Sequence, residues 1–185
     1  MRLRQALLGM AAILALGACV SAGRETQAPA AQAATAPQAA VTGVEAFRGS
    51  WVGATDGEGE TRRAAALVID ASADGGLFLR WRSAEGARDG STDDSQLKLR
   101  EATVLFPPGK TKDSWATTLK DGTQARASLA GSVLTTELTA KVRGRTEVQT
   151  YRRTLTAPDR LSLRYTRSEN GKVESTIDAE FAKLP

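Results

Sequence analysis

The chain lacks the side chains on which most catalytic and metal sites depend. Its 185 residues include no histidine, one cysteine (Cys19) and two methionines, Met1 and Met10. A single cysteine forms no disulfide within the chain. Zinc and copper sites built from histidine and cysteine are excluded, as are nucleophiles activated by an imidazole base. We therefore expect no catalytic residues, no metal ion and no cofactor, and we predict that the protein is not an enzyme.

Long hydrophobic runs are also missing. No segment reaches the roughly 18 apolar residues of a transmembrane helix. The nearest is the stretch 6–16, which follows the basic start Met1-Arg2-Leu3-Arg4 and runs through Leu16-Gly17-Ala18 into Cys19. Residues 1–18 resemble a bacterial lipoprotein signal peptide, in which the lipobox cysteine becomes the first residue of the mature chain. An ordinary secretory signal containing an incidental cysteine is the alternative.

The resemblance implies that Cys19 carries fatty acyl chains such as palmitate. Each buried CH₂ contributes about 0.8 kcal/mol, so three chains would hold the protein at a membrane. Val20 stands where an aspartate commonly retains such lipoproteins in the inner membrane. The expected location is therefore the bacterial outer membrane, on its periplasmic face.

Charge of one sign is not concentrated anywhere. Removing the signal takes away two of the 25 basic residues and none of the 21 acidic ones, so the net charge falls from +4 to +2. The remaining charges alternate along the chain instead of clustering, which gives no electrostatic basis for binding nucleic acid. We expect a membrane and a small molecule as partners, and no nucleic acid.

The chain is predicted to divide into three parts. Residues 1–18 form the signal, and residues 19–43 form a lipidated tether rich in Ala, Gln, Pro and Thr that cannot bury enough surface to fold. An alanine-rich helix is the alternative for this segment, although Pro29 and Pro37 weaken it. Residues 44–185 form a single domain.

From Phe47 onwards the sequence predicts short β-strands. Runs rich in β-branched, aromatic and leucine residues alternate apolar with polar positions, and glycine-containing turns separate them about every 8–12 residues. Apart from one turn expected at 42–47, no segment beyond the tether has a helical period. The strands are expected at 50–54, 63–70, 76–82, 96–105, 114–119, 125–130, 133–142, 146–155, 160–167 and 173–181.

Consecutive hairpins place neighbouring strands side by side and antiparallel, and closing the sheet on itself removes its edges. We therefore predict an all-β fold, a single up-and-down antiparallel barrel of about 8–10 strands. The alternation assigns these residues to the buried face: Leu67, Ile69, Leu77, Leu79, Trp81, Leu97, Leu99, Leu134, Leu138, Val142, Leu161, Leu163, Tyr165, Val173, Ile177 and Phe181. It assigns Arg80, Arg82, Lys98, Arg100, Ser162, Arg164 and Glu174 to solvent.

Phe47-Arg48-Gly49-Ser50-Trp51 opens the first predicted strand. A Gly-x-Trp at this place resembles the calycins: lipocalins, fatty-acid-binding proteins and nitrobindin-like haem-binding barrels. The resemblance implies that Gly49 and Trp51 form the base of the barrel, with Arg164 or Arg167 over the indole. The haem-binding relatives use a histidine ligand, which this chain lacks. Fatty-acid-binding relatives hold a carboxylate through Arg-x-Tyr, and here the order is reversed.

Two arginines are predicted to point into the barrel. Arg153 shares a strand face with Tyr151, and Arg167 shares one with Tyr165. A buried guanidinium must be paired, lie at a barrel end or contact an anionic ligand. Possible internal partners are Glu137, Glu147 and Glu180. The candidate ligand-binding residues are Arg153, Arg167, Tyr151 and Tyr165.

These patterns support two functions. The first is a membrane-anchored periplasmic lipoprotein whose barrel binds a small lipophilic or amphipathic ligand. Small inward residues, Ala65, Thr117, Ala127, Thr136 and Ala140, favour an interior with room for one. The alternative is a non-enzymatic structural or interaction lipoprotein of the cell envelope whose barrel is filled by its own side chains.

Overall fold

A computed structural model describes residues 43–56, 61–87 and 97–185 of the chain. Cys19, the predicted signal and the tether up to residue 42 lie outside these residues. Among the described residues, no helix is long and apolar enough to cross a bilayer. The elements are the 3₁₀ helix η1 (Gly43–Ala46) and the strands β1 (Gly49–Asp56), β2 (Thr61–Ala71), β3 (Leu77–Ala87), β4 (Lys98–Phe106), β5 (Ser114–Thr118), β6 (Gln124–Ala130), β7 (Val133–Val142), β8 (Arg145–Ala157), β9 (Arg160–Glu169) and β10 (Lys172–Lys183).

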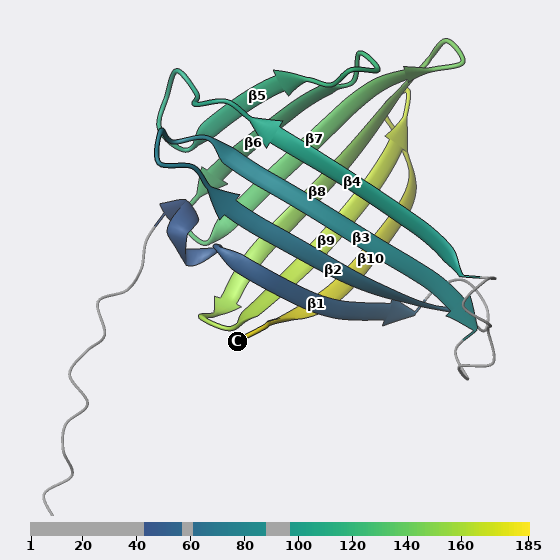
Figure 1. Cartoon of the computed structure of the whole chain (residues 1–185). Helices are drawn as coiled ribbons and strands as arrows, with labels where there is room; N and C mark the ends of the chain where they lie inside the picture. The colour runs from purple at the N-terminus through teal and green to yellow at the C-terminus, as the bar shows by residue number, and fades with distance from the viewer. Residues whose placement is uncertain (1–42, 57–60, 88–96) are drawn as a thin grey trace, which may run out of the picture. The chain divides into compact units, whose positions relative to one another are not determined.

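The strands form one antiparallel sheet that curves into a barrel (Figure 1). Its order is β4-β3-β2-β1-β10-β9-β8-β7-β6-β5, so each strand pairs with its neighbour in the chain and β1 pairs with β10. This confirms the predicted all-β up-and-down barrel. The expected turn at 42–47 is present as η1.

The barrel is nearly closed, not fully closed. β4 and β5 follow one another in the chain, yet within the described residues no ladder joins them. The expected removal of every sheet edge is therefore incomplete. Near this gap, Trp115 Nε1 on β5 donates a hydrogen bond of 2.8 Å to the Gly75 carbonyl in the β2–β3 turn. That bond links the two sides of the barrel where the ladder is missing.

Two hairpin turns show why the strands reverse so tightly. Arg143 and Gly144 connect β7 to β8 with φ of 51° and 79°, and Asn170 and Gly171 connect β9 to β10 with φ of 49° and 83°. Two successive positive φ values are the requirement of a two-residue type I′ turn, which glycine and asparagine satisfy at low cost. These two hairpins lie at the same end of the barrel, because an up-and-down order returns every second turn to one end.

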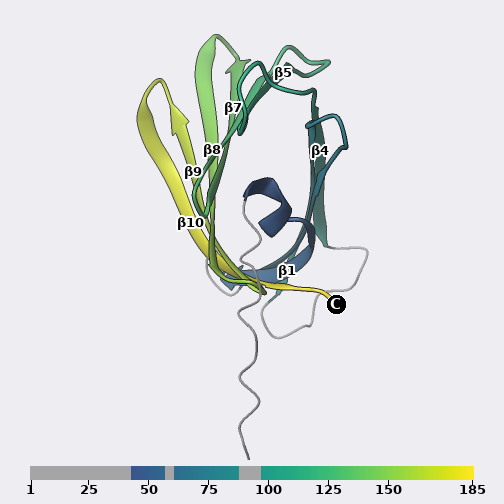
Figure 2. The same cartoon turned by 90° about the vertical axis from the view of Figure 1, so that its left-hand side faces the viewer.

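The apolar core gathers at the opposite end, called here the closed end, which carries η1 and the β2–β3, β6–β7 and β8–β9 turns. Phe47, directly after η1, is fully buried, and Val44 and Ala46 pack against the core. Figure 2 shows η1 lying between the walls of the barrel. The core residues from the strands are Trp51, Leu67, Ile69, Leu77, Leu79, Val104, Phe106, Trp115, Ala125, Ala127, Leu134, Leu161 and Phe181.

Burial of the inward-facing side chains falls steadily toward the other end, called here the open end. On β7, Leu134 and Thr136 are buried, Leu138 and Ala140 are half-buried, and Val142 is exposed. Inward positions on β3, β4 and β9 follow the same gradient. The interior is therefore sealed by apolar side chains at one end and accessible to water at the other.

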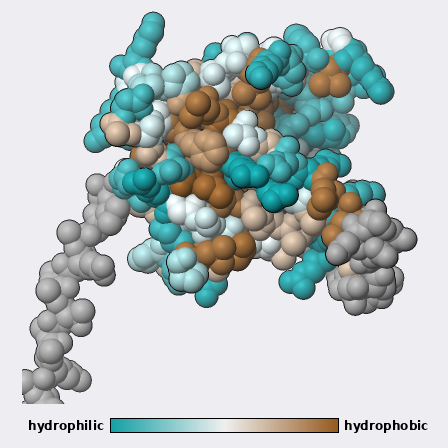
Figure 3. All heavy atoms as spheres, viewed as in Figure 1, coloured by the Kyte–Doolittle hydropathy of each residue, from teal (hydrophilic) through white to brown (hydrophobic). Residues whose placement is uncertain are grey.

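The orientation of β4 differs from the prediction. Its register pairs Leu77 with Phe106 and Leu79 with Val104, so even-numbered residues face inward. Leu99 is 70% exposed and Leu105 is 64% exposed. Hydrophobic side chains are visible on this outer face of the molecule (Figure 3). The assignment of Leu99 to the core was wrong, as was that of Lys98 and Arg100 to the outer face. Leu97, also assigned to the core, precedes β4 and is half-buried.

The physical reason is that β4 carries two conflicting alternations. Leu97 and Leu99 set one phase near the open end, and Val104 and Phe106 set the other near the closed end. Only the second pair reaches the dry core, so it decides the register, since a slip of one residue would turn every side chain of the strand to the opposite face.

Val142 and Val173 were also predicted to be buried and are exposed. Val142 lies at the open end, and Val173 adjoins a bulge between β9 and β10.

We predict that Phe106→Ala and Leu105→Ala have very different effects on stability. Phe106 is fully buried, so truncation should lower the free energy of unfolding by about 3–5 kcal/mol. Leu105, its exposed neighbour, should change that free energy by less than about 0.5 kcal/mol. Urea unfolding followed by circular dichroism measures both. The reverse order of effects would show that β4 has the opposite phase.

Candidate functional site

Three aromatic side chains cross the interior of the barrel. The ring centroids of Trp81 on β3 and Tyr151 on β8 lie 5.3 Å apart, and those of Tyr151 and Tyr165 on β9 lie 4.9 Å apart. Since β3 and β8 are not neighbours in the sheet, the first contact joins opposite walls. This aromatic row, Trp81-Tyr151-Tyr165, separates the apolar core from polar side chains nearer the open end.

Arg153 lies on the core side of the aromatic row. Its side chain is only 2% exposed, and its guanidinium carbon is 5.2 Å from the centroid of the Tyr151 ring. Nη1 donates a hydrogen bond of 3.0 Å to Thr136 Oγ1, whereas Nε has no partner. No carboxylate of the described residues pairs with this cation. Glu137 and Glu180 lie at outward register positions, opposite Thr150 and Ala54.

Burial lowers the pKa of Arg153 to about 10, the proximity of Tyr151 partly offsetting that effect. The group therefore remains protonated at neutral pH and brings a positive charge into the barrel. A buried cation with one hydrogen bond and no counter-ion opposes folding. Its remaining donors are suited to an acceptor that carries negative charge, such as a carboxylate or phosphate oxygen.

A chain of hydrogen bonds runs from the aromatic row to the open end along β8. Tyr151 Oη donates to Gln149 Oε1 over 3.0 Å, and Gln149 Nε2 donates to Glu147 Oε1 over 2.6 Å. Arg167 Nη1 completes the chain 3.5 Å from Glu147 Oε2. Burial, reinforced by the nearby Tyr165, raises the pKa of Tyr151 to about 12, so its hydroxyl stays a donor.

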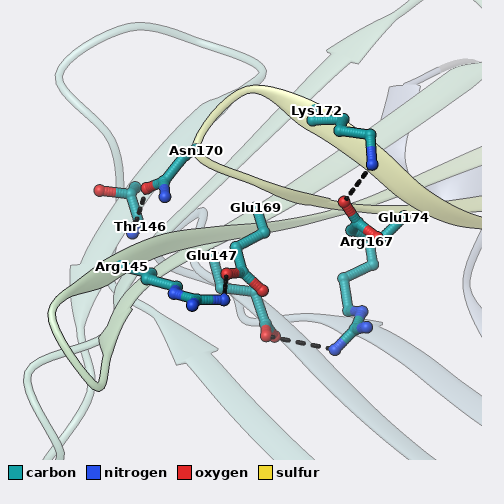
Figure 4. A network of polar contacts seen from close by, with 8 residues as sticks. All are labelled: Arg145, Thr146, Glu147, Arg167, Glu169, Asn170, Lys172 and Glu174. Atoms are coloured by element: carbon teal, nitrogen blue, oxygen red, sulfur yellow. Dashed lines mark hydrogen bonds and ion pairs between the residues drawn. The ribbon is translucent and has the colours of Figure 1, made fainter.

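The rim of the open end is a network of ion pairs and turn contacts (Figure 4). Arg145 pairs with Glu169 at 2.5 Å, and Lys172 pairs with Glu174 at 3.3 Å. The Asn170 carboxamide accepts a 3.0 Å hydrogen bond from the Thr146 amide, tying the β9–β10 turn to the start of β8. Arg167 belongs to this network, so its charge is compensated. Arg153 and Arg167 are thus in different electrostatic situations.

At the closed end, Trp51 is fully buried and its Nε1 donates a 2.9 Å hydrogen bond to the Phe47 carbonyl. The cation over its ring is Lys183 Nζ, 5.3 Å from the centroid, and not Arg164 or Arg167. Arg164 forms an exposed pair with Asp178 on the outer surface. Gly49 has a φ of 134°, and a Cβ there would lie 2.6 Å from Lys183 Cε, so glycine leaves room for this stacking.

The structure brings three of the four candidate ligand-binding residues together: Arg153, Tyr151 and Tyr165. The fourth, Arg167, lies at the rim. Sequence reasoning missed the roles of Trp81, Gln149 and Thr136. Gln149 shares the strand parity of Tyr151 and Arg153, and that signal was available. The contact of Trp81 with Tyr151 carried no sequence signal, because it depends on how closely opposite walls approach.

The fold places the chain among small up-and-down antiparallel β-barrels. No protein-family model and no curated protein matches the sequence. Among solved structures, the chain is similar to the S-type phycobiliprotein lyase of Guillardia theta, with 10% sequence identity and a TM-score of 0.37. The match covers 77% of this chain and 90% of that one. At this level of similarity, conclusions about function depend on the site itself.

We predict that Tyr151 loses its proton only at unusually high pH. The chain has two tyrosines, and the pKa of Tyr165 is also raised by burial. A tyrosinate step near pH 12 should appear in the ultraviolet absorbance of the native protein and disappear in Tyr151→Phe. Between about pH 10, the ordinary pKa of tyrosine, and pH 12, only the unfolded state releases the Tyr151 proton. The free energy of unfolding should therefore fall as the pH rises through this range. Titration of both tyrosines near pH 10 would show that the row is not buried.

Proposed function

We propose that this protein is a non-enzymatic lipoprotein, anchored through Cys19 in the bacterial outer membrane and facing the periplasm, whose barrel binds a small amphipathic molecule. The acidic group of that ligand is held by Arg153, and its apolar part lies against the aromatic row. The observation that carries the proposal is the buried, uncompensated guanidinium of Arg153 inside a barrel that is open at one end.

The arrangement of the interior supports this function. Apolar side chains fill the closed half, and the polar groups among them are few: Arg153 and Thr136, which are joined by a hydrogen bond beside the Tyr151 ring. Apolar surroundings with a small number of placed polar groups are the usual composition of a small-molecule site. A ligand oxygen at Arg153 Nε would provide the missing hydrogen bond and the missing negative charge together.

Tyr151 controls access to Arg153 in this proposal. Along β8 from the open end the inward residues are Glu147, Gln149, Tyr151 and then Arg153, so the Tyr151 ring lies above the guanidinium. An acidic group reaches Arg153 after a rotation of that ring. The half-buried Gln149, its hydrogen-bond partner, lies on the more accessible side and can follow the movement.

A second function is favoured by one observation. The contact of Trp81 with Tyr151 across the barrel shows that the protein's own side chains span the interior at this level. This suits a structural or interaction lipoprotein of the envelope with a self-filled barrel. The binding experiment below separates the two, because a self-filled barrel takes up no ligand.

We predict that the full chain binds dodecanoate more tightly than dodecanol by about 10–100-fold, since a charge-assisted hydrogen bond contributes about 1.5–3 kcal/mol. Arg153→Met should abolish this difference, and Met is chosen because it fills a buried site without charge. Arg152→Met is the matched control, since Arg152 is the adjacent, outward-facing residue of β8. Isothermal titration calorimetry gives the affinities. Equal binding of both probes, or an unchanged preference in Arg153→Met, would contradict the role of Arg153.

We predict that the mature chain begins at an acylated Cys19. Mass spectrometry of protein from a Gram-negative host should show three acyl chains on that residue. The Cys19→Ser protein in the envelope fraction should carry no acyl chain. Val20→Asp should shift the acylated protein from outer-membrane to inner-membrane fractions in a density gradient, with Ser21→Asp as the control. A mature chain that starts at another residue would rule out this anchor.

A further inference from the structure

The inward face of β4 carries two cations, Lys98 and Arg100, that form no ion pair with the described residues, although both lie close enough to Glu85 to lower its pKa. Lys98 and Arg100 lie opposite Glu85 and Ser83 of β3, on the same side of the sheet as Trp81. Among the described residues, the inward-facing Arg63 pairs with Glu85, and Arg167 pairs with Glu147. Neither Lys98 nor Arg100 forms an ion pair or a side-chain hydrogen bond within these residues.

Arg100 lies next to the aromatic row. Trp81 is opposite Ala102, and Arg100 is the next inward residue of β4 toward the open end. Its positive charge, together with that of Arg153, lowers the pKa of Tyr151, although burial raises that pKa by more. The charge of Arg100 also acts on the pKa of Tyr165 and Glu85. Arg153 on one side of Tyr151 and Arg100 on the other thus place two positive charges around one ring, and neither forms an ion pair with the described residues.

The geometry points to a ligand head group with two negative charges, held between Arg153 and Arg100. This inference rests on the proposed function and names the class of its ligand: an amphiphile with a dianionic head, such as a phosphate monoester. Arg153 supplies the buried donor without a partner, and Arg100 supplies the second charge at the solvent side. A head group with one charge would form an ion pair with only one of these two cations.

A matched pair of probes tests the inference. Decyl phosphate and decyl sulfate share a ten-carbon chain and a tetrahedral head of four oxygens, but at pH 8 the phosphate carries a charge close to −2 and the sulfate −1. Titration calorimetry with the full chain, below the concentrations at which the probes form micelles, should show decyl phosphate binding about 10–100-fold more tightly, as expected for one further charge-assisted contact.

Variants assign the preference to residues. Arg100→Gln should reduce the phosphate-to-sulfate ratio to about threefold or less and leave the affinity for decyl sulfate unchanged. Arg82→Gln is the control, because Arg82 lies on the outer face and pairs with Glu101. Arg153→Met should weaken the binding of both probes. Circular dichroism verifies that each variant remains folded, which is expected for Arg100 and Arg82 because both side chains are exposed.

Four outcomes would overturn the inference. Equal affinities for the two probes would contradict the second charge site, as would a phosphate-to-sulfate affinity ratio that persists in Arg100→Gln. Either result would leave the proposed amphiphile site unaffected. Failure of both probes to bind would overturn the proposed function as well. Inorganic phosphate is the third arm: binding as tight as that of decyl phosphate would show that the site recognises a free anion and not an amphiphile.

Discussion

The rest of the interior depends on one constraint: a positive charge, Arg153, is held in the dry half of the barrel without a counter-ion among the described residues. A guanidinium survives there because Thr136 accepts one of its hydrogen bonds and the face of Tyr151 lies beside it. Neither contact supplies a negative charge. The apolar seal on the closed side, formed by residues such as Leu134 and Leu161, also keeps water from solvating the guanidinium.

Around that charge the barrel has two unlike halves. The closed half is a hydrophobic core braced by η1, by Trp51 and by Lys183 over the indole. The open half carries paired charges at its rim, which cost little because water reaches them. The aromatic row lies at the boundary, where one side of each ring meets the core and the other meets polar groups. Such a boundary suits a molecule that is itself amphipathic.

Much of the site could be anticipated from strand parity. Tyr151, Arg153 and Leu155 alternate on one face, and the register of β8 against β7 and β9 needs only short turns to be established. The difference in environment between Arg153 and Arg167 could not be predicted in this way. Both have the same parity and similar neighbours in the chain, but Arg167 lies level with Gln149 and reaches Glu147 at the rim. Arg153 lies two inward positions deeper, where no carboxylate of the described residues pairs with it.

The sequence by itself determined the class of fold, the number and order of the strands and the tight turns, because these follow from local alternation and from residues that tolerate positive φ. Only the tertiary structure decided the phase of β4, the stacking of Lys183 on Trp51 and the contact of Trp81 with Tyr151. Each of these depends on which distant walls meet and which end of a strand is dry. A pattern along one strand does not contain that information.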